Sequence, residues 1–220
     1  MPLGMRTSGD YDRDGYLLVE GLAPVEVCRA FLHQLKSDVE RGGNQLSQLT
    51  RGSNLLKRDA IELYGYHYPP MLGLLWGLTP MVSQLLVRDL LPSYDYFRIY
   101  REGDICRVHS DRYSCEVSLS LTLDYSDGVP WDLEIGSAAA EPGPVVDDSW
   151  QGAPYRAVSM QPGDGMLYQG VTRRHGRTTP NPNFWSAHLF LHWVTRDGPY
   201  AGSAFDGKAE TVAPVNFSFR

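Results

Sequence analysis

The stretch Tyr96–Leu123, YFRIYREGDICRVHSDRYSCEVSLSLTL, decides the fold of this 220-residue chain. Residues 94–101 alternate and are rich in aromatic side chains, as strand residues often are. Residues 116–123 alternate polar and apolar side chains without exception, which predicts a strand with one face in an apolar core. The triplet His-Ser-Asp of residues 109–111 lies between the two strands. The stretch thus predicts β-structure around a histidine and a carboxylate.

His109 and Asp111 are two residues apart, so on an extended segment their side chains point to the same side of the backbone. This geometry offers an imidazole nitrogen and a carboxylate oxygen to one metal ion. A second histidine from a distant strand would complete a ligand set that leaves three octahedral positions open, which suits non-haem Fe(II) and oxygen chemistry. The same triplet arises by chance at surface strand ends. Its sequence context therefore decides the interpretation.

The composition is that of an ordinary water-soluble globular protein, with 42% hydrophobic and 21% charged residues. The formal net charge is −6 and the chain has no run of Lys and Arg, so nucleic acid is not an expected partner. No apolar stretch approaches the roughly 20 residues of a membrane span, so no membrane partner is expected either. A small chain with few recognition elements suggests a small-molecule substrate, with a peptide or protein side chain as the alternative.

Cysteines and the N-terminal residues predict where the protein works. The chain has three cysteines, Cys28, Cys106 and Cys115. Their odd number and wide spacing argue against a disulfide framework and against a structural zinc site. Residues 1–10 lack the apolar core of a signal peptide. These observations favour reduced thiols in a cytoplasmic protein.

The remaining elements follow from periodicity and turn residues. Helical spacing predicts helices over residues 24–38 and 71–91, the second interrupted by Pro80. Residues 41–60 and 137–153 are expected to be loops. Further strands are expected at residues 14–20, 131–135, 157–160, 166–168 and 185–194, and a tail with weak signals at residues 200–220. Helices followed by short strands favour an α+β domain built on a β-sandwich or barrel.

Four ordered pieces of the chain resemble the Fe(II)/2-oxoglutarate-dependent oxygenases, in particular the small prolyl-hydroxylase-like group. The pieces are DGYLLVEGLAPVEVC (14–28), the stretch 96–123, VSMQPGDGMLYQGVTRRHGR (158–177) and NFWSAHLFLHWVTRDGPYAG (183–202). The likeness covers roughly residues 14–207. It implies a double-stranded β-helix, or jelly-roll, core with N-terminal helices packed on one sheet.

The implied organisation is one oxygenase domain over residues 1–220. It consists of a helix-rich part at 14–91, the jelly-roll core at about 94–195 and a C-terminal tail at 200–220.

The resemblance implies that His109 and Asp111 are the first two iron ligands and His175 the third. The spacing 175 − 109 = 66 is similar to that of the family, and His175 follows the Pro-Gly-Asp turn and its strand. His188 and His192 on the last strand compete for the third position. A lone strand histidine is more often a hydrogen-bonded structural residue, and we interpret both in this way.

The chain departs from the family where 2-oxoglutarate is held. Relatives place an Arg or Lys about ten residues after the third ligand, but residues 180–187 contain no cation. A buried dianion needs a paired charge, and the fork of an arginine fits a carboxylate. Arg177 is the first substitute, because it lies two residues from His175, and Arg98 is the second. Either side chain is otherwise a solvated surface arginine.

Other residues are implied as contacts of the cosubstrate or substrate. Tyr100 and Ser118 would donate hydrogen bonds to 2-oxoglutarate, although Tyr100 is equally well a packed aromatic residue. Arg112 and Trp131 would contact the substrate. The alternatives are that Arg112 pairs with an acidic neighbour and that Trp131 belongs to the core.

The implied cofactors are Fe(II), 2-oxoglutarate and O2. The implied reaction is hydroxylation of an unactivated C–H bond of a small molecule, such as an amino acid or a natural-product intermediate, while 2-oxoglutarate is decarboxylated to succinate. A peptide or protein side-chain hydroxylase and a desaturase or cyclase of the same superfamily are alternatives. Two other classes are a non-catalytic jelly-roll protein that binds a small molecule and a cupin-type metal enzyme that needs no keto acid. Neither substrate identity nor oligomeric state can be read from the sequence.

Overall fold

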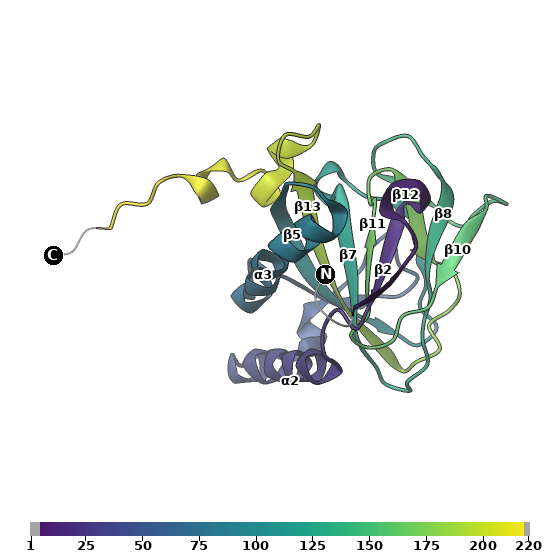
Figure 1. The fold of residues 1–220 in the computed structure, drawn as a ribbon. Coiled ribbons are helices and arrows are strands. Elements are labelled where there is room, and N and C mark those ends of the chain that lie inside the picture. Colours follow the sequence, from purple (N-terminus) through teal and green to yellow (C-terminus); the bar gives the residue numbers. More distant parts are fainter. Residues whose placement is uncertain (1–4, 218–220) are drawn as a thin grey trace.

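The computed structural model describes residues 5–217, in which two antiparallel sheets face each other (Figure 1). The larger sheet has the order β1-β2-β11-β7-β13-β5-β4-β3 and the smaller sheet the order β10-β8-β12-β6-β9. Strands distant in the sequence are thus neighbours in both sheets. The predicted α+β fold with a jelly-roll core is confirmed.

The strands have the following bounds. The larger sheet contains β1 (Arg6–Ser8), β2 (Tyr16–Glu20), β3 (Thr50–Arg51), β4 (Ala60–Tyr64), β5 (Leu90–Arg101), β7 (Val117–Tyr125), β11 (Gly165–Tyr168) and β13 (Trp185–Thr195). The smaller sheet contains β6 (Cys106–Ser110), β8 (Leu133–Ala139), β9 (Val145–Asp147), β10 (Tyr155–Val158) and β12 (Arg173–Arg177). The helices are α1 (Tyr11–Asp14), α2 (Val25–Arg41) and α3 (Pro69–Leu86), with 3-10 turns η1 (Leu46–Leu49), η2 (Tyr113–Cys115), η3 (Ala201–Gly207) and η4 (Ala209–Val212).

The alternation of β7 determines how the layers are stacked. Its apolar side chains, from Val117 to Leu123, join the main hydrophobic core together with residues of α2 and α3. Figure 1 shows both helices on the side of the larger sheet that faces away from the smaller sheet. The polar side chains Ser118, Ser120 and Thr122 are fully buried on the opposite face. The space between the sheets therefore has polar groups in its wall, as a binding site requires.

Helix α3 and strand β5 differ from the sequence prediction at their shared boundary. The helix ends at Leu86 and is continuous through Pro80, where an interruption is expected. The hydroxyl of Thr79 donates to the Leu75 carbonyl and accepts a hydrogen bond from Trp193 Nε1, which ties this turn to β13. The packing of α3 against the sheet thus outweighs the tendency of proline to interrupt a helix. Strand β5 begins at Leu90, earlier than predicted.

Segments expected to be loops contain short elements. Residues 41–60 include η1 and β3, and residues 137–153 include the end of β8 and all of β9. In the C-terminal tail, η3 and η4 follow β13, and η3 packs against β5. Residues 218–220 of the tail lie outside the described residues. Within residues 5–217, no helix combines the length and hydropathy needed to cross a membrane.

Candidate metal centre

Pairing between two strands of the smaller sheet brings the predicted ligands together. His109 lies on β6, Asp111 directly follows that strand, and His175 lies on β12. The strands β6 and β12 are antiparallel, and His175 is the register partner of His109. The 66-residue separation, 175 − 109, is thus closed by one strand pairing.

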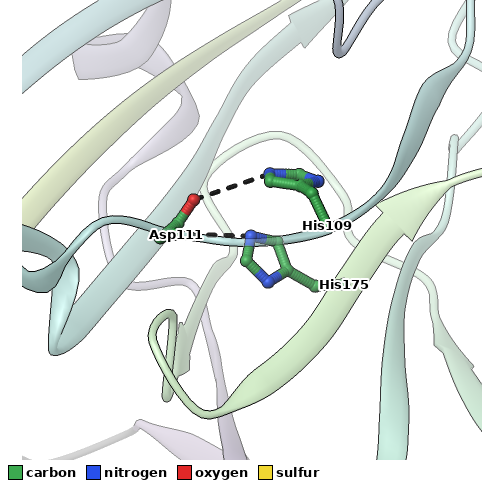
Figure 2. Close-up of side chains that lie close together, drawn as sticks. All are labelled: His109, Asp111 and His175. Carbon is green, nitrogen blue, oxygen red and sulfur yellow. Dashed lines mark ion pairs between the residues drawn. The ribbon is translucent and has the colours of Figure 1, made fainter. Parts of the chain in front are cut away.

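The three side chains form a compact group, in which the two imidazoles lie 4.2 Å apart by their ring centroids and Asp111 faces both from one side (Figure 2). Asp111 Oδ1 is 3.6 Å from His109 Nε2, and Asp111 Oδ2 is 3.5 Å from His175 Nε2. One potential ligand atom from each residue lies within 4.8 Å of the other two. These distances allow one metal ion to contact all three side chains after small adjustments.

Hydrogen bonds fix the orientation of both imidazoles. His109 Nδ1 lies 2.8 Å from the Arg107 carbonyl oxygen, and His175 Nδ1 lies 2.9 Å from the Arg173 carbonyl oxygen. A carbonyl only accepts, so both rings donate from Nδ1 and leave the Nε2 lone pair available to a metal. Burial also lowers the pKa of His109, which favours the neutral form that binds metal.

Asp111 stays ionised in this environment. Burial alone would raise its pKa, but the facing imidazoles, above all His175, hold the pKa of the carboxyl below its ordinary value. The Ser118 hydroxyl adds a long hydrogen bond of 3.4 Å to Asp111 Oδ2. The donor set is therefore two imidazoles and a carboxylate, which is suited to Fe(II) with open positions.

A small cavity joins the ligands to the predicted cosubstrate residues. It is lined by Tyr96, Arg98, Tyr100, Cys106, His109, Asp111, Leu133, Tyr168, His175, Gly176, Arg177 and Phe190. The structure thus places Arg177, Arg98 and Tyr100 at one cavity with all three candidate ligands. Ser118, Arg112 and Trp131 are absent from this lining.

Arg177 carries a buried positive charge without a carboxylate partner among residues 5–217. Its side chain is only 1% exposed, Nη1 donates to the Trp131 carbonyl oxygen, and the guanidinium lies over the Trp131 ring. Nη2 has no hydrogen-bond partner in the described part of the chain. Burying a cation with an unpaired donor costs folding free energy unless a bound ligand pairs with that donor.

Arg98 is buried too, but its charge is already compensated. Its guanidinium pairs with Glu62 across the β4–β5 ladder, with Nε 2.7 Å from Glu62 Oε1. Nη1 also donates to the hydroxyl of Tyr100 over 3.1 Å. Of the two arginines, Arg177 is therefore the one whose charge remains available to an anionic ligand.

The other predicted contact residues lie around this cavity. Arg112 is half exposed at the Asp111 end, where it lies 4.0 Å from the centroid of the Tyr94 ring and pairs with Asp206. Trp131 is buried behind Arg177, and its Nε1 donates to the Thr179 carbonyl oxygen. Arg112 thus lies at the exposed end of the site next to Asp111, whereas Trp131 packs against Arg177.

The competing histidines occupy the inner face of β13. His188 Nδ1 lies 3.4 Å from the Thr122 hydroxyl, and His192 Nδ1 lies 2.9 Å from the Ser118 hydroxyl. Burial lowers the pKa of His192 to about 4 and holds that of His188 well below its ordinary value, so both rings are neutral. Neither belongs to the group formed by His109, Asp111 and His175.

Sequence reasoning missed Cys115, Tyr96 and Phe190, and it named His192 only as a competitor for the third ligand position. Cys115 and His192 form a second group with Asp111, whose potential ligand atoms also lie within 4.8 Å of one another. Tyr96 and Phe190 line the cavity from β5 and β13. Strand alternation could have indicated Tyr96, because it shares a face with Arg98 and Tyr100. No sequence signal places Cys115, because its position depends on the turn η2.

The comparisons with known proteins support the fold. No protein-family model matches the sequence, and no curated protein matches it. Among solved structures, the prolyl-4-hydroxylase of Pseudomonas putida has a TM-score of 0.58 and 17% sequence identity, covering 86% of this chain and 96% of its own. The fold predicted by the resemblance is thus confirmed.

Two further solved structures share this fold. The non-haem α-ketoglutarate-dependent carbocyclase SnoK from nogalamycin biosynthesis has a TM-score of 0.64 and 12% identity, over 93% of this chain and 88% of its own. HygX from Streptomyces hygroscopicus, with nickel, 2-oxoglutarate and hygromycin B bound, has a TM-score of 0.61 and 13% identity, over 85% of each chain. At such low identity the likeness establishes the architecture, and the chemistry has to be argued from the site.

Proposed function

We propose that the protein is an Fe(II)- and 2-oxoglutarate-dependent oxygenase that acts on a small molecule. The observation that carries this proposal is the position of Arg177, a buried arginine with an unpaired nitrogen, two residues from His175 and at the same cavity as His109 and Asp111. A metal centre alone fits many enzymes. A metal centre beside an uncompensated buried cation favours an anionic cosubstrate.

The residues present fit the metal. His109 and His175 present their Nε2 atoms to Asp111 while their Nδ1 atoms are held by backbone carbonyls. Three protein ligands of this kind leave room for further ligands on Fe(II). When bound, Fe(II) with 2-oxoglutarate and O2 supplies the oxidation of an unactivated C–H bond, and 2-oxoglutarate is converted to succinate and CO2.

The charges and hydrogen-bond donors present also suit a keto diacid, which would have to widen the cavity, because its volume in this structure is only about 20 Å³. Arg177 Nη2 is available to one carboxylate, and the hydroxyl of Tyr100 lies on the same cavity wall. The Arg98–Glu62 pair adds no net charge, so of the two arginines that line the cavity Arg177 is the one with an uncompensated positive charge. This arrangement compensates for the missing cation at residues 180–187, where Ser186 is instead hydrogen-bonded to Asn181.

The substrate class is proposed from the rim of the site and from similar proteins. Arg112 and the ring of Tyr94 lie next to Asp111, where a substrate can approach without binding the metal. HygX was solved with hygromycin B bound, and SnoK comes from nogalamycin biosynthesis. We therefore propose a natural-product intermediate or an amino acid as substrate, with hydroxylation as the reaction. Desaturation and ring closure are variants that product mass distinguishes from hydroxylation, because both remove two hydrogens instead of adding an oxygen.

The cosubstrate proposal is tested by binding and turnover. We expect protein loaded with Ni(II), as a redox-inactive substitute, to bind 2-oxoglutarate in calorimetry, and the Arg177→Gln variant to lose affinity by about 10- to 100-fold, because one charge-assisted contact to a carboxylate is worth about 1.5–3 kcal/mol. The double variant Glu62→Gln/Arg98→Gln is the matched control, because it removes a buried pair without leaving a lone charge. The affinity of this double variant for 2-oxoglutarate should fall much less.

Turnover is measured as succinate formed from 2-oxoglutarate in air with Fe(II) and a native extract. His109→Ala and Asp111→Ala should abolish both metal binding and succinate formation. The proposal is wrong if neither variant changes metal binding and no succinate forms above the metal-free control. An unchanged 2-oxoglutarate affinity in Arg177→Gln, together with a collapse in the double variant, would instead assign the anchor to Arg98.

A further inference from the structure

A second cavity lies on the outer side of β5, separate from the metal ligands. It encloses about 170 Å³ and is lined by Tyr66, Leu72, Trp76, Ser93, Tyr94, Asp95, Phe205, Asp206, Lys208 and Thr211. Strand alternation explains the separation, because Tyr96 and Arg98 line the metal cavity whereas Asp95 points to the opposite face. The walls are contributed by α3, by the turn before it, by β5 and by the C-terminal 3-10 turns.

Asp95 is a buried acid without an internal partner. Its side chain is 1% exposed, and neither carboxylate oxygen has a hydrogen-bond partner among residues 5–217. Burial raises the pKa of Asp95 to about 7. Gly65 makes room for the carboxylate, because a Cβ at that position would lie 1.7 Å from Asp95 Oδ1. The fold thus accommodates an acid that it does not neutralise, and burying such a group costs stability.

Three aromatic side chains, Tyr66, Trp76 and Phe205, line this cavity. Tyr66 and Trp76 are each 52% exposed, and Phe205 lies on the opposing C-terminal segment. The Tyr66 ring is already engaged, because the Tyr64 ring stacks on it with centroids 5.4 Å apart and the ammonium of Lys208 lies 5.2 Å from its centroid. The face of an aromatic ring attracts cations, and the attraction grows where water is excluded. Aromatic walls and an unpaired carboxylate therefore select the same kind of ligand.

We propose that this cavity binds a small organic ammonium ion, with Asp95 as its counter-charge and Trp76 and Phe205 as its aromatic walls. A hard metal cation would need several oxygen ligands, and the other carboxylate in the lining, Asp206, is paired with Arg112 at 2.9 Å. An anionic ligand would be repelled by Asp95. The volume of about 170 Å³ equals that of roughly six waters at about 30 Å³ each, which limits the ligand to a small amine.

Two contacts place this site next to the metal centre. Tyr94 lines the cavity and also stacks on His192, whose ring belongs to the group around Asp111. Arg112, which follows Asp111, lies over Tyr94 and pairs with Asp206 of the C-terminal segment. The proposed ammonium site does not depend on the oxygenase chemistry. Binding of an ammonium ion can therefore be measured without iron or 2-oxoglutarate.

The test is calorimetric titration of the metal-free protein with methylammonium and tetramethylammonium at about pH 8, where Asp95 is mainly ionised. Neutral tert-butanol, similar in size to tetramethylammonium, is the ligand control. We expect both cations to bind, tert-butanol to bind at least about tenfold more weakly, and Asp95→Asn to weaken cation binding by about tenfold or more. Asp95→Asn removes a buried charge and should fold, which circular dichroism checks.

Three further variants distinguish cation binding at this cavity from a general effect of the protein's negative charge. Asp89→Asn removes an exposed carboxylate elsewhere on the chain and should leave cation binding unchanged. Trp76→Leu should weaken binding, and Lys208→Met should preserve or strengthen it, because a like charge is removed from the wall. Absence of cation binding to the wild-type protein, or equal binding by the wild type and Asp95→Asn, would overturn the proposal. Neither result would affect the 2-oxoglutarate titration.

Discussion

At the scale of single residues, Gly170 limits the position of the candidate ligand Asp111. The backbone amide of Asp111 donates to the Gly170 carbonyl oxygen over 2.8 Å. A Cβ at position 170 would lie 2.6 Å from Asp111 Oδ2, 2.6 Å from Ser118 Oγ and 2.5 Å from the Cys115 carbonyl oxygen. The last contact involves backbone, so a side chain at this position cannot be accommodated by rotating a neighbour.

We therefore expect Gly170→Ala to weaken binding of Ni(II) or Zn(II) by about 10- to 100-fold, the range typical of changes next to a ligand. Metal titration followed by calorimetry measures the effect. Gly77→Ala on α3 is the control, because its new Cβ would meet nothing within 4 Å and helix propensity favours alanine. Unchanged metal affinity in Gly170→Ala would show that Asp111 is not held in place by this contact.

The residues of the candidate site were predictable to different degrees. Spacing alone indicated His109 and Asp111, and family resemblance added His175; the structure brings the three together, while metal binding itself stays a prediction. The sequence did not show that Arg177 and not Arg98 keeps an uncompensated charge, because this difference arises from Glu62, which neutralises Arg98 across the β4–β5 ladder. Tertiary pairing of this kind leaves no local pattern in the sequence.

At the scale of elements, hydrophobic alternation was a better guide than proline. The polar–apolar repeat of β7 predicted its two faces, and the structure has this arrangement. Pro80 suggested an interruption, but α3 passes through it, because the helix is held on the sheet by side chains from β5 and β13. The unpredicted strand β4 is short, and its pairing with β5 is a long-range contact.

The hydrogen bond from Trp193 Nε1 to the Thr79 hydroxyl, 2.8 Å long, links α3 to β13. We expect Thr79→Val to lower the free energy of unfolding by about 1–3 kcal/mol, because a buried indole N–H would lose its acceptor. Thr79→Ser keeps the hydroxyl and should lose less. Urea denaturation measures both variants, and equal stabilities would contradict this role of Thr79. Metal affinity should be unchanged, because α3 lies on the far side of the sheet from the ligands (Figure 1).

At the scale of the whole molecule, the candidate site spans both sheets. The ligand histidines and Arg177 belong to β6 and β12 of the smaller sheet, whereas Arg98 and Tyr100 lie on β5 of the larger sheet. A metal ion alone would connect residues of one sheet. A cosubstrate that contacts the metal, Arg177 and Tyr100 would connect the two sheets, so each ligand should stabilise the fold by a separate increment.

We expect Ni(II) at about 100 times its Kd to raise the free energy of unfolding by about 2.7 kcal/mol, and 2-oxoglutarate at the same excess to add a similar increment only when the metal is present. Arg177→Gln should keep the first increment and lose most of the second. His175→Ala should lose both, because it removes a ligand on which the second step depends. Chemical denaturation at fixed ligand concentrations measures these steps. Stabilisation by 2-oxoglutarate in metal-free protein, or a full second increment in Arg177→Gln, would contradict this order of binding and would place the cosubstrate away from the metal and Arg177.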